Sequence, residues 1–222
     1  MAILFLTIFI LIGILFAFRV YTYENSEFRK MTGYSLFNIW TNPHIKNTYL
    51  LVQSLKYLQG EYKLLLNLAF PTSGGKRKLD AIVIHESGIY VFNIQHKNGW
   101  IYGREQDEQW AQATNNKNKL ISFANPIIET KKSILDLQDQ IANEKSDLFH
   151  LVILFTDNCS FKKIVVKSNN VSVMKINEMK HFWKAGTEQK MSAQEIDSVY
   201  QTLKQYTGGQ NTSFHMNHAT NH

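Results

Sequence analysis

Two predicted strands in the middle of the chain carry a short row of polar residues that could do chemistry. Residues 79–85 (LDAIVIH) and 89–95 (IYVFNIQ) are rich in β-branched and aromatic residues, and the Glu-Ser-Gly sequence between them is typical of a hairpin turn. The antiparallel register places Asp80 opposite Asn93, with Gln95 on the same face. Asp80 could supply an oxygen ligand to Mg²⁺, whereas the two amides are uncharged. The pattern indicates either a binding site or the polar surface of an edge strand.

Three segments of this region resemble a known family, in the same order along the chain. They are residues 79–84 (LDAIVI), 88–92 (GIYVF) and 97–103 (KNGWIYG). They look like parts of the NERD (nuclease-related) domain, which belongs to the broader PD-(D/E)XK nuclease-like superfamily. The resemblance implies an α/β fold with a restriction-endonuclease-like core, in which a mixed central β-sheet is flanked by helices.

The family pattern has an Asp on the first strand and Glu-x-Lys on the second. The resemblance assigns these positions to Asp80, Asn93 and Gln95, and it places a further helix carboxylate of the family at Tyr49. A nuclease of this kind needs acidic oxygens to hold Mg²⁺ and a lysine near the attacking water. Only Asp80 fits, as a weak metal ligand. We therefore expect a non-catalytic or weakly active relative without a cofactor.

An alternative is an active Mg²⁺-dependent nuclease whose site has moved. Lys97 lies on the same predicted strand face as Gln95, ~6.5–7 Å further along. Glu129 stands in the first turn of a predicted helix, where family members often have Gln. These two residues could complete a site with Asp80. A solvated helix start explains Glu129 without any chemistry, because a carboxylate suits the helix dipole there.

The chain is basic, with a net charge of +6 and a pI of about 9.2, which permits contact with nucleic acid or anionic lipid. The residues predicted to bind nucleic acid are Lys76, Arg77, Lys78 and Lys97. A solvated turn explains the first three equally well, and the partner could instead be a protein. The single cysteine, Cys159, excludes an intramolecular disulfide.

The N-terminal stretch predicts a membrane anchor. Residues 1–18 hold no charged side chain and would extend about 27 Å as a helix, close to the thickness of the hydrocarbon core. No Lys or Arg precedes this run, and bulky residues occupy the place of a cleavage site, which favours an uncleaved anchor over a signal peptide. The first basic residues, Arg19, Arg29 and Lys30, all follow it. The positive-inside tendency then places the N-terminus outside and the domain in the cytoplasm, on a single-pass cell-membrane anchor.

The remaining periodicities complete the predicted organisation. We expect an anchor at 1–19, a juxtamembrane linker at 20–45, a NERD-like domain at 46–206 and a disordered polar tail at 207–222. Helices are expected at 46–58, 127–143, 177–185 and 192–206, and strands at 62–70, 99–103, 108–112, 149–156, 163–167 and 171–176, with a polar loop at 115–119. The expected function is a membrane-anchored, nuclease-derived module that binds nucleic acid or a protein partner.

Overall fold

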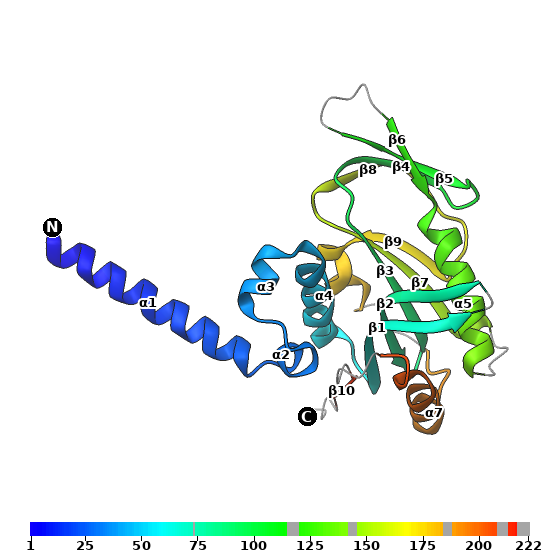
Figure 1. The fold of residues 1–222 in the computed structure, drawn as a ribbon, viewed down its shortest axis with the longest axis horizontal. Helices are drawn as coiled ribbons and strands as arrows, with labels where there is room; N and C mark the ends of the chain where they lie inside the picture. The colour runs from blue at the N-terminus through cyan, green and yellow to red at the C-terminus, as the bar shows by residue number, and fades with distance from the viewer. Residues whose placement is uncertain (73, 115–119, 142–145, 184–187, 208–212, 217–222) are drawn as a thin grey trace.

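A computed structural model describes residues 1–72, 74–114, 120–141, 146–183, 188–207 and 213–216 (Figure 1). The strands are β1 (Tyr62–Thr72), β2 (Gly75–His85), β3 (Gly88–Gln95), β4 (Gly99–Arg104), β5 (Gln109–Ala113), β6 (Leu120–Ala124), β7 (Phe149–Phe155), β8 (Cys159–Val165), β9 (Val171–Lys175) and β10 (Ser213–Met216). The helices are α1 (Ala2–Glu24), α2 (Glu27–Thr32), α3 (Leu36–Thr41), α4 (Pro43–Ser54), α5 (Pro126–Ile141), α6 (Met179–Phe182) and α7 (Ala193–Lys204), with 3-10 turns at Leu55–Tyr57, Ser146–Leu148 and Ile176–Glu178.

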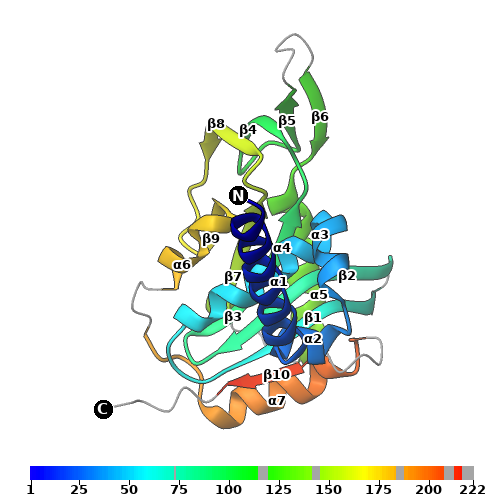
Figure 2. The ribbon, with the colours of Figure 1, turned by 90° about the vertical axis from the view of Figure 1, so that its left-hand side faces the viewer.

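The described strands form two mixed sheets flanked by helices, which confirms the predicted α/β class. The larger sheet has the order β10-β1-β2-β3-β7-β9, and the smaller has the order β6-β5-β4-β8. In both views the smaller sheet lies at the end of the domain opposite α7 (Figures 1 and 2). The predicted hairpin is confirmed: β2 pairs antiparallel with β3 from Ala81–Phe92 to His85–Gly88.

Glycine lets the chain leave the larger sheet after β3. Gly99 has a φ of 74°, and a Cβ there would lie 2.3 Å from the carbonyl oxygen of Ala113. A side chain would therefore clash with backbone as well as strain the turn. Gly103 allows a second close approach, because the Trp110 ring occupies the space that a Cβ would need. These contacts hold β4 against β5 and separate the smaller sheet from the hairpin.

Helices cover both faces of the larger sheet. On one face α4, the 3-10 turn after it and α6 contribute Leu51, Leu55 and Met179 to a core with the side chains of Val83 and Phe92. On the other face α5 and α7 pack over a second core, whose helix residues include Leu137, Ile196 and Leu203. The near-continuous apolar sequences of β3 and β7 reflect this burial on both faces. The result is a three-layer domain that holds the hairpin rigidly.

Much of the segment predicted as a juxtamembrane linker, 20–45, is helical and packs on the domain. α1 continues past the apolar run to Glu24, and its last turn buries Tyr23 in the first core together with Phe28 of α2 and Ile39 of α3. The Tyr23 hydroxyl donates to the carbonyl of Tyr34. Burial of their apolar inner faces stabilises these short helices, which would not be stable in an extended tether.

α1 is long and apolar enough to cross a membrane, judged by length and composition alone. It leaves the domain on the side of α2 and α3 (Figures 1 and 2). Its mean hydropathy over the most apolar window is 2.7, and the window has no buried residue.

Part of the predicted disordered tail forms a strand. β10 pairs antiparallel with the outer edge of β1, from Tyr62–Met216 to Leu65–Ser213. An open strand edge offers unpaired amides and carbonyls, and the tail backbone satisfies them. The rest of the tail beyond 207, and the predicted polar loop at 115–119, lie outside the described residues.

Candidate functional site

The candidate site lies where the β2–β3 pairing ends. The predicted register is confirmed as far as the Ala81–Phe92 pair, which puts Asp80 next to Asn93 one step further along. The β1–β2 pairing is also interrupted at this point, opposite Asn67, whose φ is 53°. Local disruption of both ladders leaves polar groups free of sheet hydrogen bonds, and such places often become sites.

Asp80 uses its carboxylate to replace a missing ladder bond. The amide of Ile94 donates to Asp80 Oδ2 at 2.6 Å. Burial raises the pKa of Asp80, and the Ile94 hydrogen bond and the nearby imidazoles of His44 and His96 act against that rise. One carboxylate oxygen therefore has a structural task in the strand.

Asn93 and Gln95 satisfy each other. Gln95 Nε2 donates to Asn93 Oδ1 at 2.6 Å, and Asn93 Nδ2 donates to Thr130 Oγ1 of α5 at 2.9 Å. The Thr130 hydroxyl donates in turn to the carbonyl of Pro126 at 2.7 Å. This chain of neutral groups runs from β3 into α5 and contains neither a carboxylate nor an ammonium.

The contacts place the side chains of Asp80 and Asn93 on different faces of the sheet, not on the predicted common face. Asp80 Oδ1 lies 4.0 Å from His44 Nε2 on α4, whereas Asn93 bonds to α5 on the other side of the sheet. Side-chain alternation in β2 breaks at this residue, since Leu79 packs in the core under α5 and Ala81 packs in the core under α4. The distortion opposite Asn67 explains the switch of face.

Two histidines next to Asp80 were missed by the sequence reasoning. His44 Nδ1 lies 3.1 Å from His96 Nε2, and Asn47 Nδ2 lies 3.3 Å from His96 Nδ1. One proton arrangement satisfies these contacts: Asn47 donates to His96, His96 donates to His44, and the His44 Nε2–H faces Asp80. Burial lowers the pKa of His96, and the neighbouring His44 lowers it further. His44 and His96 are 52 residues apart, so no spacing signal joins them.

The donor set does not fit the Mg²⁺ that the family pattern implies. Asp80 supplies one carboxylate, and the amide oxygen of Asn93 already accepts from Gln95. Among the described residues, no three His, Cys, Asp or Glu side chains are grouped to hold a metal ion. Mg²⁺ prefers several hard oxygen ligands, and the described residues of this site offer it only the carboxylate of Asp80.

Lys97 and Glu129 do not complete a site with Asp80 in the described part of the chain. The Lys97 ammonium lies 4.6 Å from the centre of the Phe123 ring. Glu129 is exposed on the first turn of α5, and no contact joins it to Asp80 within the residues that the structure describes.

The predicted phosphate contacts in β2 have different environments. Lys76 and Lys78 are exposed, whereas Arg77 pairs with Asp136 of α5 at 2.9 Å between Nε and Oδ2. Only the two lysines remain available on this strand.

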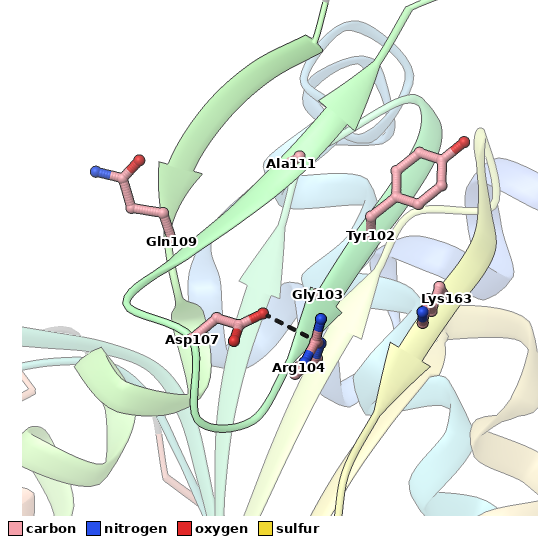
Figure 3. Close-up of a pocket in the computed structure, with 7 residues that line it drawn as sticks. All are labelled: Tyr102, Gly103, Arg104, Asp107, Gln109, Ala111 and Lys163. Atoms are coloured by element: carbon pink, nitrogen blue, oxygen red, sulfur yellow. Dashed lines mark ion pairs between the residues drawn. The ribbon is translucent and has the colours of Figure 1, made fainter.

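A second polar region, also missed, lies on the smaller sheet. Arg104 and Lys163 line two adjoining hollows of about 200 and 330 Å³, and Figure 3 shows the residues that line the smaller one. Tyr102 borders the first hollow and Lys167 the second. The lysine-rich sequence of β8, with its alternate aromatic partners on β4, is the signal that could have found it.

Comparison with known proteins identifies the fold's family. The family model for the nuclease-related domain, NERD, matches residues 44–156. The chain belongs to the NERD family. The matched region spans nearly all of α4, β1 to β6, α5 and β7, so the polar contacts around Asp80 and Asn93 lie within it, whereas Lys163 and Lys167 of the second polar region lie beyond it.

A relative and a solved structure can be compared with this NERD protein. An uncharacterized protein of Bacillus anthracis is 28% identical over 143 residues, which cover 64% of this chain and 66% of the relative. The chain thus spans slightly less than two thirds of that relative's length. The crystal structure of AF1548, a protein of unknown function, aligns with a TM-score of 0.33 and 9% identity over 72% of this chain and 66% of its own.

Proposed function

We propose that this protein is a membrane-tethered NERD domain that binds nucleic acid without cutting it. The observation that carries the proposal is the hydrogen-bonded chain from Gln95 through Asn93 to Thr130. At the family positions of the catalytic Glu and Lys, this chain has two amides that bond to each other. Their polar atoms serve packing between β3 and α5 rather than a metal or an attacking water.

The size of the expected rate loss favours a site without catalytic activity over a slow enzyme. Losing a single electrostatic element of a catalytic site lowers rates by ~10²–10³. Here the carboxylate at Asn93, the ammonium at Gln95 and the helix carboxylate at Tyr49 are all absent, and the surviving Asp80 is bonded to the Ile94 amide. The relocated nuclease gains no support from Lys97, whose ammonium lies over an aromatic ring.

A cleavage assay on the full chain in detergent micelles tests catalytic silence. We expect no Mg²⁺- or Mn²⁺-dependent cleavage of single- or double-stranded DNA or RNA above the level of the Asp80→Ala variant. Robust cleavage by the wild type that disappears in Asp80→Ala would overturn the proposal and favour the relocated nuclease.

Nucleic acid is the proposed partner because the chain carries a net charge of +6 and lysines exposed on two strands, Lys78 of β2 and Lys163 of β8. Binding to nucleic acid should weaken steeply as salt rises, because phosphate contacts release counterions. Binding of a protein partner that is insensitive to salt would favour the other interpretation of this domain.

Exposed aromatic side chains beside α1 support the membrane tether. Phe37 and Trp40 of α3 are 68% and 64% exposed, and the Trp40 ring lies 6.1 Å from that of Phe16 in α1. Phe16 is near the domain end of the apolar run, where a bilayer interface would lie, and aromatic rings favour that depth. α3 would then rest in the headgroup region.

The proposed orientation has the N-terminus outside and the domain in the cytoplasm. Protease added to intact cells should leave the domain uncut until the membrane is permeabilised. Digestion from outside would show the reverse orientation, and extraction by high salt without detergent would show a peripheral protein.

A further inference from the structure

The outer face of the smaller sheet combines aromatic rings with cations. Along β4 the inner positions are taken by buried Ile101 and by Gly103, which carries the Trp110 ring. Strand alternation therefore directs Trp100, Tyr102 and Arg104 outwards, about 6.6 Å apart from one to the next. Figure 3 shows Tyr102 and Arg104 on this face beside Lys163.

β8 places lysines alongside these residues. It runs parallel to β4, with Tyr102 paired to Lys163, and an irregularity after Ile101 inserts one extra residue, Lys162. The Lys162 ammonium lies 4.6 Å from the centre of the Trp100 ring. Lys167 follows the end of β8 and lines the larger hollow. The bulge thus brings a cation to each outward aromatic residue.

The acidic residues near the hollows leave this face positive. The Glu105 carboxylate accepts from Lys131 Nζ at 2.7 Å, from the amides of Lys167 and Ser168, and from the Ser168 hydroxyl, so its charge is already matched. Asp107 lies 3.8 Å from Arg104 in an exposed pair, which water screens strongly. Neither Lys163 nor Lys167 forms an ion pair within the described residues.

We propose that the outer face of β4 and β8 binds single-stranded nucleic acid, with phosphates in the hollows against Arg104, Lys163 and Lys167 and bases against Trp100 and Tyr102. Proteins that bind single strands combine a basic track with aromatic platforms in this way. The inference deepens the proposed function by giving nucleic acid a surface away from the eroded β2–β3 site.

An anionic bilayer fits this face less well than nucleic acid does. The aromatic contacts of α1 run to α3 and α4, through Phe16–Trp40 and Tyr23–Tyr49. The anchoring helix thus joins the domain at α2 to α4 rather than at the smaller sheet (Figure 1). Binding of lipid headgroups would account for the lysines but not for the aromatic side chains on this face.

The test measures binding of a labelled oligothymidine of about 16 nucleotides to the full chain in neutral detergent micelles, by fluorescence anisotropy over a salt series. Lys163→Glu with Lys167→Glu should lower the affinity at least ~tenfold and reduce the salt slope by about 2. Trp100→Ala should lower it roughly fivefold or more. The variant Lys76→Glu with Lys78→Glu tests the competing surface on β2. The matched controls are Lys132→Glu with Lys180→Glu, two exposed lysines on α5 and α6, for charge, and Trp40→Ala for an exposed tryptophan. Both should bind nearly as the wild type does.

Each outcome separates this inference from the proposed function. If the lysine pair in β2 matters and the pair beside β8 does not, nucleic-acid binding stands but its surface is the one around Asp80, and the inference fails. Equal losses for both pairs would show non-specific attraction and would also overturn it. Binding to vesicles rich in phosphatidylserine without binding to the oligonucleotide would overturn both proposals. Cleavage by the wild type would remove the non-catalytic function and leave the binding surface intact. Circular dichroism checks that each variant is folded.

Discussion

The two polar regions of this domain differ in what their polar groups bond to. At the end of the β2–β3 hairpin, Asp80 holds the Ile94 amide, and Gln95 bonds to Asn93, which bonds to Thr130. On the outer face of β4 and β8, the ammonium groups of Lys163 and Lys167 point to solvent beside hollows in the surface. In the first region the polar groups hydrogen-bond to other groups of the domain. In the second region the lysine charges face solvent and are available to an anionic ligand.

Under the proposed function, this difference explains how a nuclease-related fold loses cleavage and keeps the binding of nucleic acid. Buried polar groups must be paired, and neutral amides can pair with each other at low cost in desolvation. Asn and Gln at the half-buried positions of the family's Glu and Lys would therefore preserve packing and, under the proposed function, remove the chemistry. Surface cations face no such constraint, because water solvates them until a ligand arrives.

Restoring the family pattern gives the largest expected effect. Asn93→Glu with Gln95→Lys would return a carboxylate and an ammonium to β3 on the α5 side of the sheet, where the Asp80 carboxylate would have to turn from the α4 side to join them. Each regained electrostatic element can raise a rate by ~10²–10³. We expect Mn²⁺ to raise the melting temperature of this variant but not that of the wild type, and Mn²⁺-dependent cleavage to become detectable. The control adds Asp80→Ala, which should abolish both effects. A folded variant without either gain would show that the hairpin cannot hold a metal even with the family residues.

Removing the buried carboxylate of the smaller sheet should reduce stability. Burial tends to raise the pKa of Glu105, but hydrogen bonds from Lys131, Ser168 and the amide of Lys167 lower it to about 2. A depressed pKa adds stability that is present above about pH 4.5 and is lost as the pH falls towards 2, which amounts to about 3 kcal/mol. Glu105→Gln should lose up to this amount at pH 7 and should unfold with less dependence on acid.

Denaturant unfolding at pH 7 and pH 3 measures the Glu105 effect. Asp107→Asn, which removes the exposed carboxylate of the neighbouring ion pair, is the matched control and should stay within about 0.5 kcal/mol of the wild type. A Glu105→Gln variant as stable as this control would contradict the structural role given to Glu105.

Asp80 gives the smallest expected effect and tests the hydrogen bonding of the hairpin. Asp80→Ala leaves the Ile94 amide without its acceptor and should cost about 1–3 kcal/mol. Asp80→Asn keeps an acceptor oxygen and removes the carboxyl group, whose pKa is raised by burial. A raised carboxyl pKa penalises the folded state above that pKa, so Asp80→Asn should match or exceed the wild type at pH 7, and the difference should vanish below pH 3.8. Equal losses for Asn and Ala in thermal unfolding would show that the charge itself stabilises the fold.

Local patterns in the sequence predicted the hairpin and the main helices well. Alternation and turn residues located β2 and β3, and periodic Leu and Ile located α5, whose ends at Pro126 and Ile141 lie within two residues of the predicted 127–143. α4 begins earlier than predicted because the Asn42 side chain accepts from the amides of His44 and Ile45 ahead of the first periodic leucine. These features depend on neighbours in sequence, which a pattern can reveal.

Features set by distant contacts were not predicted. The smaller sheet depends on parallel pairing between Gly99 and Cys159, and no local pattern specifies that partner. The His44–His96 contact likewise joins segments that the fold brings together. The face of Asp80 depends on a left-handed residue, Asn67, on the adjacent strand. Each requires knowledge of the partner strand that periodicity does not contain.

Tyr23 joins α1 rigidly to the folded domain, so the helix is not a flexible tether. Its ring is buried against Tyr49, and its hydroxyl donates to the carbonyl of Tyr34, so the last turn of the helix is part of the folded body. In the proposed membrane-inserted state, tilting of the helix would have to swing the whole domain. Folding of the chain would then fix the height and orientation of the domain above the bilayer. The domain would present the same face to every ligand.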